Sequence, residues 1–306
     1  MGENGAKESA SLAAANGVLL LDKPLGITSN IAVQRVRRLF DRAKAGHTGT
    51  LDPLATGLLP ICIGEATKFS HPILNSDKSY RATMRLGWRS TTGDSEGELT
   101  AVGEPVFSDE ELAAALRQLT GEIEQLPPMY SAVRVGGERL YKLARKGISV
   151  ERKPRCIRIQ RLEVLDRKGP DLEISVSCSK GTYIRVLAED LAEKLGTAAY
   201  LVALRRESIG ALEVADAIDM DSLEDLPEAH RPALLKPVDL LLNDLPKLLL
   251  SEEDARRLSH GQLIVGASDN PVPEIRVYTT DGRFLGLGEV QSDRSLKAKR
   301  LLSQAF

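Results

Sequence analysis

A single carboxylate, Asp52, stands in the middle of the stretch GHTGTLDPLATGLLP, which spans residues 46–60. Three glycines and a proline surround it, and these residue types favour tight turns and backbone with positive φ. An exposed aspartate is ionised near neutral pH, so Asp52 can act as a nucleophile, a base or an electrostatic stabiliser. An acid in a glycine-rich loop is more often only a turn former, and the loop alone leaves both interpretations open.

Three other chemistries are poorly supported by the sequence. The stretch lacks the Gly-Lys-Ser/Thr ending of a phosphate-binding P-loop. Glycosidases use a pair of carboxylates, and no partner for Asp52 stands nearby in the sequence. The cysteines Cys62, Cys156 and Cys178 are odd in number, far apart and without a CxxC pair, so neither a disulfide framework nor a zinc site is indicated.

The segment before this loop predicts a strand and a helix. GVLLLDKP (17–24) is a short buried-strand pattern that ends at a proline. TSNIAVQRVRRLF (28–40) predicts a helix capped by Thr28 or Ser29. The apolar side chains of this helix share one face and are Val33, Val36 and Phe40. A cationic stripe on the opposite side is formed by Arg35, Arg38 and Arg42.

The remaining pattern mixes strands and helices without a regular βαβ alternation. Strands are predicted over residues 78–87, 156–166, 172–179 and 200–210. Helices are predicted over residues 108–119, with a capping box of Ser108 and Glu111, and over residues 181–196. The expected fold class is therefore α+β, with a mixed, largely antiparallel sheet and flanking helices.

The sequence suggests a large domain followed by a small one. Residues 1–16 are small and polar and predict a disordered leader. The main domain is expected over residues 17–246, and its last part, about 211–246, is an acidic and partly helical connector. Residues 247–306 contain one helix and short strands, enough for a small β-barrel packed on the main body.

The net charge of −2 conceals an asymmetry along the chain. Residues 129–210 contain 17 Lys and Arg against 10 Asp and Glu, whereas residues 211–254 contain 3 against 12. The basic blocks keep nucleic acid open as a partner, although ordinary solvated faces explain such charges more often. Apolar runs fall far short of the ~20 residues of a membrane span, and no signal peptide pattern opens the chain. A cytoplasmic protein without a membrane partner is expected.

Five sequence blocks occur in a characteristic order. They are LLDKPLGITSN (20–30), GHTGTLDPLATGLLPICIGEATK (46–68), KSYRATMRLG (78–87), SKGTYIR (179–185) and YLVALRR (200–206). Together they closely resemble the bacterial tRNA pseudouridine-55 synthases of the TruB family, from Gly17 to the C-terminus. The block at 46–68 is highly specific. Residues 124–152 resemble the insertion with which that family closes on RNA, and residues 247–306 resemble its PUA-type RNA-binding domain.

This resemblance implies that uridine-55 in the T-loop of tRNA is isomerised to pseudouridine. The uridine is flipped out, its C–N bond breaks, the uracil rotates in the site, and C5 joins the same ribose carbon. Asp52 matches the family's essential aspartate. The resemblance leaves open whether Asp52 adds covalently to the sugar or stabilises a cationic sugar and removes a ribose proton.

The resemblance also assigns roles to other residues. Tyr80 matches the aromatic ring that stacks on the target uracil and lies where the C5 proton must be removed. Arg185 matches the arginine paired with the aspartate, and such a pair favours the ionised acid and fixes its rotamer. The residues expected to bind the flipped nucleotides or line the uracil pocket are His47, Tyr183 and Leu204. Those expected to support the catalytic loop are Lys23 and Pro24.

The expected partner is therefore the T-loop and elbow of tRNA. Phosphate contacts are expected at the arginine stripe and within residues 134–168. Neither a metal nor an organic cofactor is expected, and the chain is expected to act as a monomer without a guide RNA. One alternative is a tRNA-binding folding helper whose isomerase site is idle. Another is a guide-RNA-dependent synthase, which shares the catalytic motifs but needs surfaces for docking partner proteins.

Overall fold

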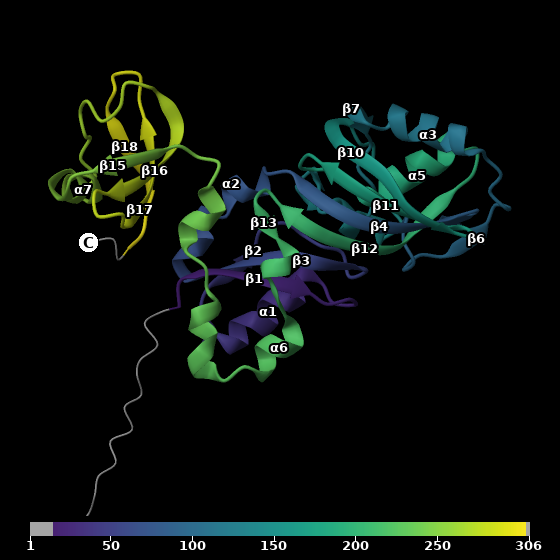
Figure 1. The fold of residues 1–306 in the computed structure, drawn as a ribbon, viewed down its shortest axis with the longest axis horizontal. Coiled ribbons are helices and arrows are strands. Elements are labelled where there is room, and N and C mark those ends of the chain that lie inside the picture. The colour runs from purple at the N-terminus through teal and green to yellow at the C-terminus, as the bar shows by residue number, and fades with distance from the viewer. Residues whose placement is uncertain (1–14, 304–306) are drawn as a thin grey trace, which may run out of the picture.

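The computed structural model describes residues 15–303, and a large sheet forms its main body (Figure 1). The sheet has ten strands in the order β14-β1-β3-β12-β4-β11-β10-β7, with β13 beside β12 and β2 beside β3. The strands are β1 (Gly17–Lys23), β2 (Ala45–His47), β3 (Ala55–Ile63), β4 (Lys78–Leu86), β7 (Gly121–Gln125), β10 (Arg155–Lys168), β11 (Asp171–Cys178), β12 (Ala199–Ile209), β13 (Leu212–Glu213) and β14 (Ile218–Asp219). The β1–β14 and β3–β12 pairs are parallel and the other pairs are antiparallel, which confirms the predicted mixed, largely antiparallel sheet.

Two groups of helices flank this sheet. The helices α1 (Ser29–Leu39) and α6 (Met220–Asp225) lie beside its β1–β3 half. The helices α3 (Asp109–Gln118) and α5 (Ile184–Lys194) cover the half formed by β4, β11 and β10 (Figure 1). The predicted caps are confirmed, because the Thr28 hydroxyl accepts from the Ile31 amide and both bonds of the Ser108–Glu111 capping box form.

Alternation along β1 divides the interior between two cores. Leu19 and Leu21 belong to the core that packs under α1 and α5. Val18 and Leu20 point to the opposite face and pack in a second core with residues of the connector. Successive side chains of a strand point to opposite faces of the sheet, so a strand buried on both faces needs a continuous apolar run such as GVLLL.

Short elements complete the main body. They are the helices η1 (Gly64–Phe69), α2 (His71–Leu74), α4 (Leu140–Ala144), η2 (Val214–Asp216), η3 (Glu228–Leu234) and η4 (Val238–Leu242), and the strands β5 (Trp88–Ser90), β6 (Leu99–Ala101), β8 (Arg134–Val135) and β9 (Glu138–Arg139). The acidic connector is partly helical, as predicted, and it also adds β13 and β14 to the main sheet. Within residues 15–303, no helix is long and apolar enough to cross a membrane.

A separate sheet domain stands at the C-terminal end of the chain (Figure 1). Its elements are β15 (Lys247–Leu250), α7 (Glu252–Ser259), β16 (Val272–Thr279), β17 (Phe284–Val290) and β18 (Leu296–Leu301), with strand order β15-β16-β17-β18. Phe284 packs on Phe69 of the main body at 5.6 Å between ring centroids, and the Tyr278 hydroxyl donates to Asp239 at 2.8 Å. A separate C-terminal sheet domain is thus confirmed, while its PUA type and the domain boundaries stay predictions. The predicted leader lies, except for residues 15 and 16, outside the described residues.

Candidate active site

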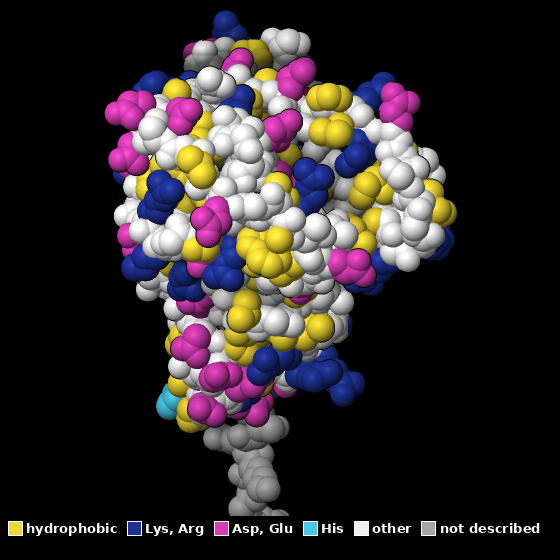
Figure 2. Space-filling view, turned by 90° about the vertical axis from the view of Figure 1, so that its right-hand side faces the viewer, with side chains coloured by type: hydrophobic (Ala, Val, Ile, Leu, Met, Phe, Trp, Pro, Cys, Tyr) yellow, Lys and Arg dark blue, Asp and Glu magenta, His cyan; other side chains and the backbone are white. Residues whose placement is uncertain are grey.

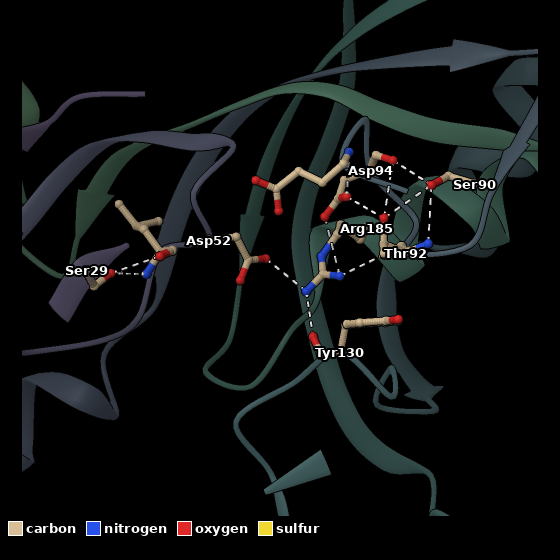
Figure 3. Close-up of polar contacts among 9 residues, drawn as sticks. Ser29, Asp52, Ser90, Thr92, Asp94, Tyr130 and Arg185 are labelled. Carbon is tan, nitrogen blue, oxygen red and sulfur yellow. Dashed lines mark hydrogen bonds and ion pairs between the residues drawn. The ribbon is translucent and has the colours of Figure 1, made fainter. Parts of the chain in front are cut away.

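The loop that carries Asp52 connects β2 to β3 and is fixed by backbone hydrogen bonds. The Ser29 hydroxyl donates to the Leu51 carbonyl at 2.9 Å and accepts from the Leu51 amide at 2.8 Å (Figure 3). The Gly26 amide donates to the Pro53 carbonyl at 2.9 Å. The start of α1 and the turn before it therefore hold the backbone on both sides of Asp52.

Two of the three glycines around Asp52 are required by the backbone. Gly49 and Gly57 have φ of 113° and 100°, a region that favours glycine. A Cβ at Gly57 would lie 2.2 Å from the Arg206 carbonyl oxygen on the neighbouring strand. Gly46 has neither feature, because its φ is not positive and open space surrounds the position of a Cβ.

Arg185, at the start of α5, makes an ion pair with Asp52. Its Nη2 lies 2.9 Å from Oδ2 of Asp52 and donates to the Tyr130 carbonyl at 2.8 Å (Figure 3). Its Nη1 donates to the Thr92 carbonyl at 2.8 Å and lies 3.5 Å from Oδ2 of Asp94. The Arg185 side chain is 6% exposed, whereas that of Asp52 is 39% exposed. A fixed, buried cation thus orients a carboxylate that stays open to a ligand.

A second acid, Asp94, stands behind Arg185 and was not anticipated from the sequence. It is buried and accepts hydrogen bonds from the Thr92 hydroxyl at 2.5 Å and the Glu96 amide at 3.1 Å. Burial raises the pKa of Glu96, and the charges of Asp94 and Asp52 raise it further. Asp94 stands 42 residues after Asp52, and the fold alone brings the two to one guanidinium, so local sequence carried no signal for it.

A cavity of about 290 Å³ opens beside Asp52. It brings together five residues singled out from the sequence, namely Asp52, Tyr80, Tyr183, Arg185 and Leu204. The backbone of Tyr183 is fixed by the Gln125 side chain, which accepts from its amide at 2.7 Å and donates to its carbonyl at 3.1 Å. The insertion contributes Tyr130 and Ser131 to the same lining.

Lys23, Pro24 and His47 are not among the residues that line this cavity. Lys23 is fully buried, and its ammonium donates to the carbonyls of Pro24 and Ile27 at 2.7 and 2.8 Å. Burial lowers the pKa of Lys23 to about 8, and the nearby Asp52 opposes this shift. Burial, followed by the charge of Arg206, lowers the pKa of His47, whose Nδ1 has no hydrogen-bond partner. Lys23 thus supports the backbone before α1, while Nδ1 of His47 is buried without a hydrogen-bond partner.

Two cations that the sequence analysis missed line the cavity beside Tyr80. Arg206 is 1% exposed and stands directly opposite Tyr80 in the β12–β4 pairing. Lys78 is 9% exposed and precedes Tyr80 by two residues on β4. The signal was present as alternation, because Arg206 shares the inward face of its strand with Leu204, two residues earlier.

Arg35, one of the three arginines of the predicted stripe, pairs with an acid in the structure, and its contact with RNA stays a prediction. Both Nε and Nη2 of Arg35 donate to the carboxylate of Glu224, at 2.7 and 2.6 Å. Arg38 and Arg42 are exposed and border a shallow groove together with Arg37 and Gln34. On the face seen in Figure 2, basic side chains are interspersed with acidic ones and form no continuous basic surface. The cationic surface of α1 is therefore narrower than the sequence indicates.

The basic segment 134–168 is likewise partly neutralised. Arg161 and Lys168 pair with Glu163 and Asp166 at 2.5 and 2.6 Å. The described part of the chain holds no group of three or more His, Cys, Asp or Glu side chains placed to bind a metal ion. The predicted absence of a metal or cofactor stays a prediction.

Comparisons with family models and with solved structures show the class of protein to which this chain is similar. The model of the TruB family pseudouridylate synthase N-terminal domain matches residues 37–184. Models of the tRNA pseudouridylate synthase B C-terminal domain and of the pseudouridine synthase II TruB C-terminal region match residues 185–243 and 246–302. The fold is also similar to solved structures of a Cbf5-Nop10-Gar1 complex and of an H/ACA RNP bound to a substrate RNA. The TM-scores are 0.71 and 0.72 at 23% and 22% identity, covering 94% and 95% of this chain and 84% and 86% of those chains.

Curated relatives narrow the class to one family. The tRNA pseudouridine synthase B of Aromatoleum aromaticum is 50% identical over 288 residues, covering 94% of this chain and 93% of that protein. The tRNA pseudouridine synthase B of Neisseria meningitidis serogroup B is 48% identical over 294 residues, covering 95% and 96%. The chain belongs to the TruB family of pseudouridylate synthases.

Proposed function

We propose that this chain is a tRNA pseudouridine synthase that isomerises uridine-55 in the T-loop of tRNA to pseudouridine. The observation that carries the proposal is the ion pair of Asp52 and Arg185 at a cavity that Tyr80 also lines. A cavity of about 290 Å³ suits a single nucleoside and not a duplex, so the uridine enters it flipped out of the T-loop.

Asp52 is assigned the reaction at the sugar. Its carboxylate is oriented by the ion pair with Arg185 and, at 39% exposed, is open to C1′ of a flipped nucleotide. When the bond between C1′ and N1 breaks, the sugar is electron-deficient, and a carboxylate against it stabilises that charge or bonds to it. Arg185 orients Asp52 before the substrate binds, so little reorganisation is needed during the reaction.

The other side of the cavity is assigned to the base. Tyr80 stacks on the uracil, and its phenol lies where the C5 proton must leave. Tyr183 and Leu204 confine the detached ring, so that it rotates without escaping. His47 is assigned to the flipped nucleotides from the family resemblance. Lys23 and Pro24 are assigned a supporting role beneath the catalytic loop.

The same assignment indicates how the chain binds its tRNA partner. Flipping the uridine costs a few kcal/mol, which stacking and phosphate contacts offset. We assign RNA closure to residues 124–152, because Tyr130 of this segment already contacts Arg185. The catalytic domain would span residues 17–246, and residues 247–306 would form a PUA-type RNA-binding domain. One chain supplies every assigned group, which supports a monomer that works without a guide RNA. We assign this monomer to the cytoplasm, where tRNA is its expected partner.

Mapping of pseudouridine by mass spectrometry tests the proposed function. Purified protein is incubated with an unmodified tRNA transcript, and the RNA is then treated with a reagent that adds mass to pseudouridine. We expect the mass shift at position 55 and none in a transcript that carries cytidine there. A protein that binds and refolds the tRNA but leaves position 55 unmodified would favour the folding-helper alternative.

A further inference from the structure

The cavity carries more positive charge than its structure neutralises. Arg206 and Lys78 line it, and both are buried. Arg206 donates to the carbonyls of Leu58 and Gly49 at 2.8 and 3.2 Å, and Lys78 donates to the carbonyls of Leu74 and Ser76. Within residues 15–303, neither cation has a carboxylate within ion-pair distance. Unpaired buried charges are costly and rare, so their place beside a reaction cavity indicates a function.

The geometry directs Arg206 at Tyr80. The two residues are directly opposite each other on the antiparallel strands β12 and β4, so their side chains share one face of the sheet. Both side chains line the cavity and are buried, Tyr80 at 8% and Arg206 at 1% exposed, so little water screens the charge of Arg206 from the phenol of Tyr80. The bonds to Leu58 on β3 and to Gly49 fix the guanidinium beside the loop that carries Asp52.

The other titratable groups around Tyr80 do not favour a negative charge on its phenol. Asp52, on the catalytic loop, disfavours an anion at the phenol, and Cys178 on β11 would do so only as a thiolate, whose formation burial opposes. Lys78 is on the same strand but its ammonium is held by two carbonyls. Burial raises the pKa of Tyr80, and Arg206 is the group that opposes this rise most strongly.

We propose that Arg206 is a positioning residue that stabilises the anion of Tyr80 while the phenol transfers the C5 proton. This inference rests on the proposed function. It explains why a fully buried arginine stands where no acid compensates it, since its anionic partner exists only during the reaction. Arg206 acts through Tyr80 and has no assigned contact with the sugar.

The proton transfers balance without another reactant. After C5 has bonded to C1′, C5 still carries its hydrogen, and N1 is unprotonated and doubly bonded to C6. The phenol of Tyr80 gives its proton to N1, directly or through water, and becomes a phenolate beside Arg206. The phenolate then takes the proton from C5. The C5–H electron pair forms the C5–C6 double bond, the C6–N1 pair withdraws to N1, and Tyr80 is restored.

The first test measures the phenol in the protein without RNA. A fluorinated tyrosine, whose phenol is more acidic, is incorporated at position 80 alone, and its ionisation is followed by fluorine NMR. We expect Arg206→Gln to raise the apparent pKa of this phenol by about 1 to 3 units, the usual effect of a neighbouring opposite charge. Arg205→Gln is the matched control, because Arg205 is adjacent on β12 but pairs with Asp22. An equal titration in Arg206→Gln and the parent protein overturns the proposal.

The second test measures the proton transfer itself. Single-turnover rates are compared for tRNA with hydrogen and with deuterium at C5 of uridine. We expect Arg206→Gln to slow conversion by about tenfold or more and to increase the hydrogen-to-deuterium rate ratio, because C5–H cleavage becomes more rate-limiting. Slower conversion with an unchanged ratio would mean that Arg206 only supports the fold. If the parent protein forms no pseudouridine, the proposed function fails, while the fluorine titration still reports on Arg206.

Arg206→Lys provides the test if Arg206→Gln does not fold. Lysine keeps a positive charge near the phenol but cannot make both carbonyl contacts of the guanidinium. We expect the titration of residue 80 and the isotope ratio to stay near those of the parent protein. A titration displaced upward by about 1 to 3 units despite the retained charge would contradict the electrostatic role.

Discussion

The arginines of the cavity and those at the C-terminal end of α1 and just after it differ in burial and in what holds them. Arg185 and Arg206 are both buried and are fixed by carbonyls and, for Arg185, by carboxylates. Arg38, on α1, and Arg42, three residues after its end, are both exposed. Charges act strongly where water is excluded and are screened by salt where it is not. Changes in the cavity should therefore alter the rate, and changes on α1 should alter affinity and its salt dependence.

The largest effect is expected from Asp52→Asn. The amide keeps the size of the side chain but removes the charge that the sugar requires, so turnover should be abolished. Affinity for tRNA should stay within about tenfold, or 1.4 kcal/mol, because the site is assembled without that charge. Single-turnover conversion and filter binding measure the two quantities, and thermal melting confirms that the variant is folded. Near-normal conversion by a folded variant would reduce Asp52 to a turn residue.

Tyr80→Phe should separate the two roles of one ring. Stacking on the uracil survives the loss of the hydroxyl, so affinity should be retained. Conversion should fall by about 10²-fold, the usual scale for a positioned acid–base group. The same single-turnover assay measures this loss. A rate close to that of the parent protein would show that the phenol takes no part in removing the C5 proton, and would also remove the basis for the role of Arg206.

Asp94→Asn should have a smaller effect, again on the rate. The substitution keeps the volume of the buried side chain but removes the charge 3.5 Å from Nη1 of Arg185. We expect about a tenfold loss of conversion at saturating tRNA, equivalent to 1.4 kcal/mol, a typical contribution of a hydrogen bond to a charged group. The control is Asp171→Asn, which breaks the pair of Asp171 with Arg85 outside the cavity lining. Equal rates for both variants would mean that carbonyls alone position Arg185.

The difference between cavity and surface also marks what sequence can predict. Alternation and capping signals predicted β1, β4, β12 and α1, because these features depend on residues only two or three positions apart in the sequence. The turn residues around Asp52 predicted that it stands in a shaped loop, and the family resemblance predicted that this loop belongs to the active site. Asp94 was missed because it reaches Arg185 only through the fold, and Arg206 was overlooked although it lies on an inward strand position. The partner of Arg35, Glu224, stands 189 residues away, so a helix pattern alone overstates the free charge.

The double variant Arg38→Glu and Arg42→Glu tests whether the exposed arginines contribute to tRNA affinity. If α1 binds tRNA phosphates, the variant should bind tRNA less tightly, and the slope of log affinity against log salt should fall by about one unit for each phosphate that is no longer neutralised. The conversion rate at saturating tRNA should not change, because neither arginine lines the cavity. Binding titrations at several salt concentrations measure the slope.

Arg35→Gln is the matched control for this surface. Its guanidinium is already neutralised by two hydrogen bonds to Glu224, so it releases few counterions when RNA binds. Removing this charge should change the salt slope less than removing those of Arg38 and Arg42. An equal decrease in slope would mean that Arg35 exchanges Glu224 for a phosphate when tRNA binds. An unchanged slope in both variants would place the RNA away from α1 and leave the phosphate contacts to the insertion and the C-terminal domain.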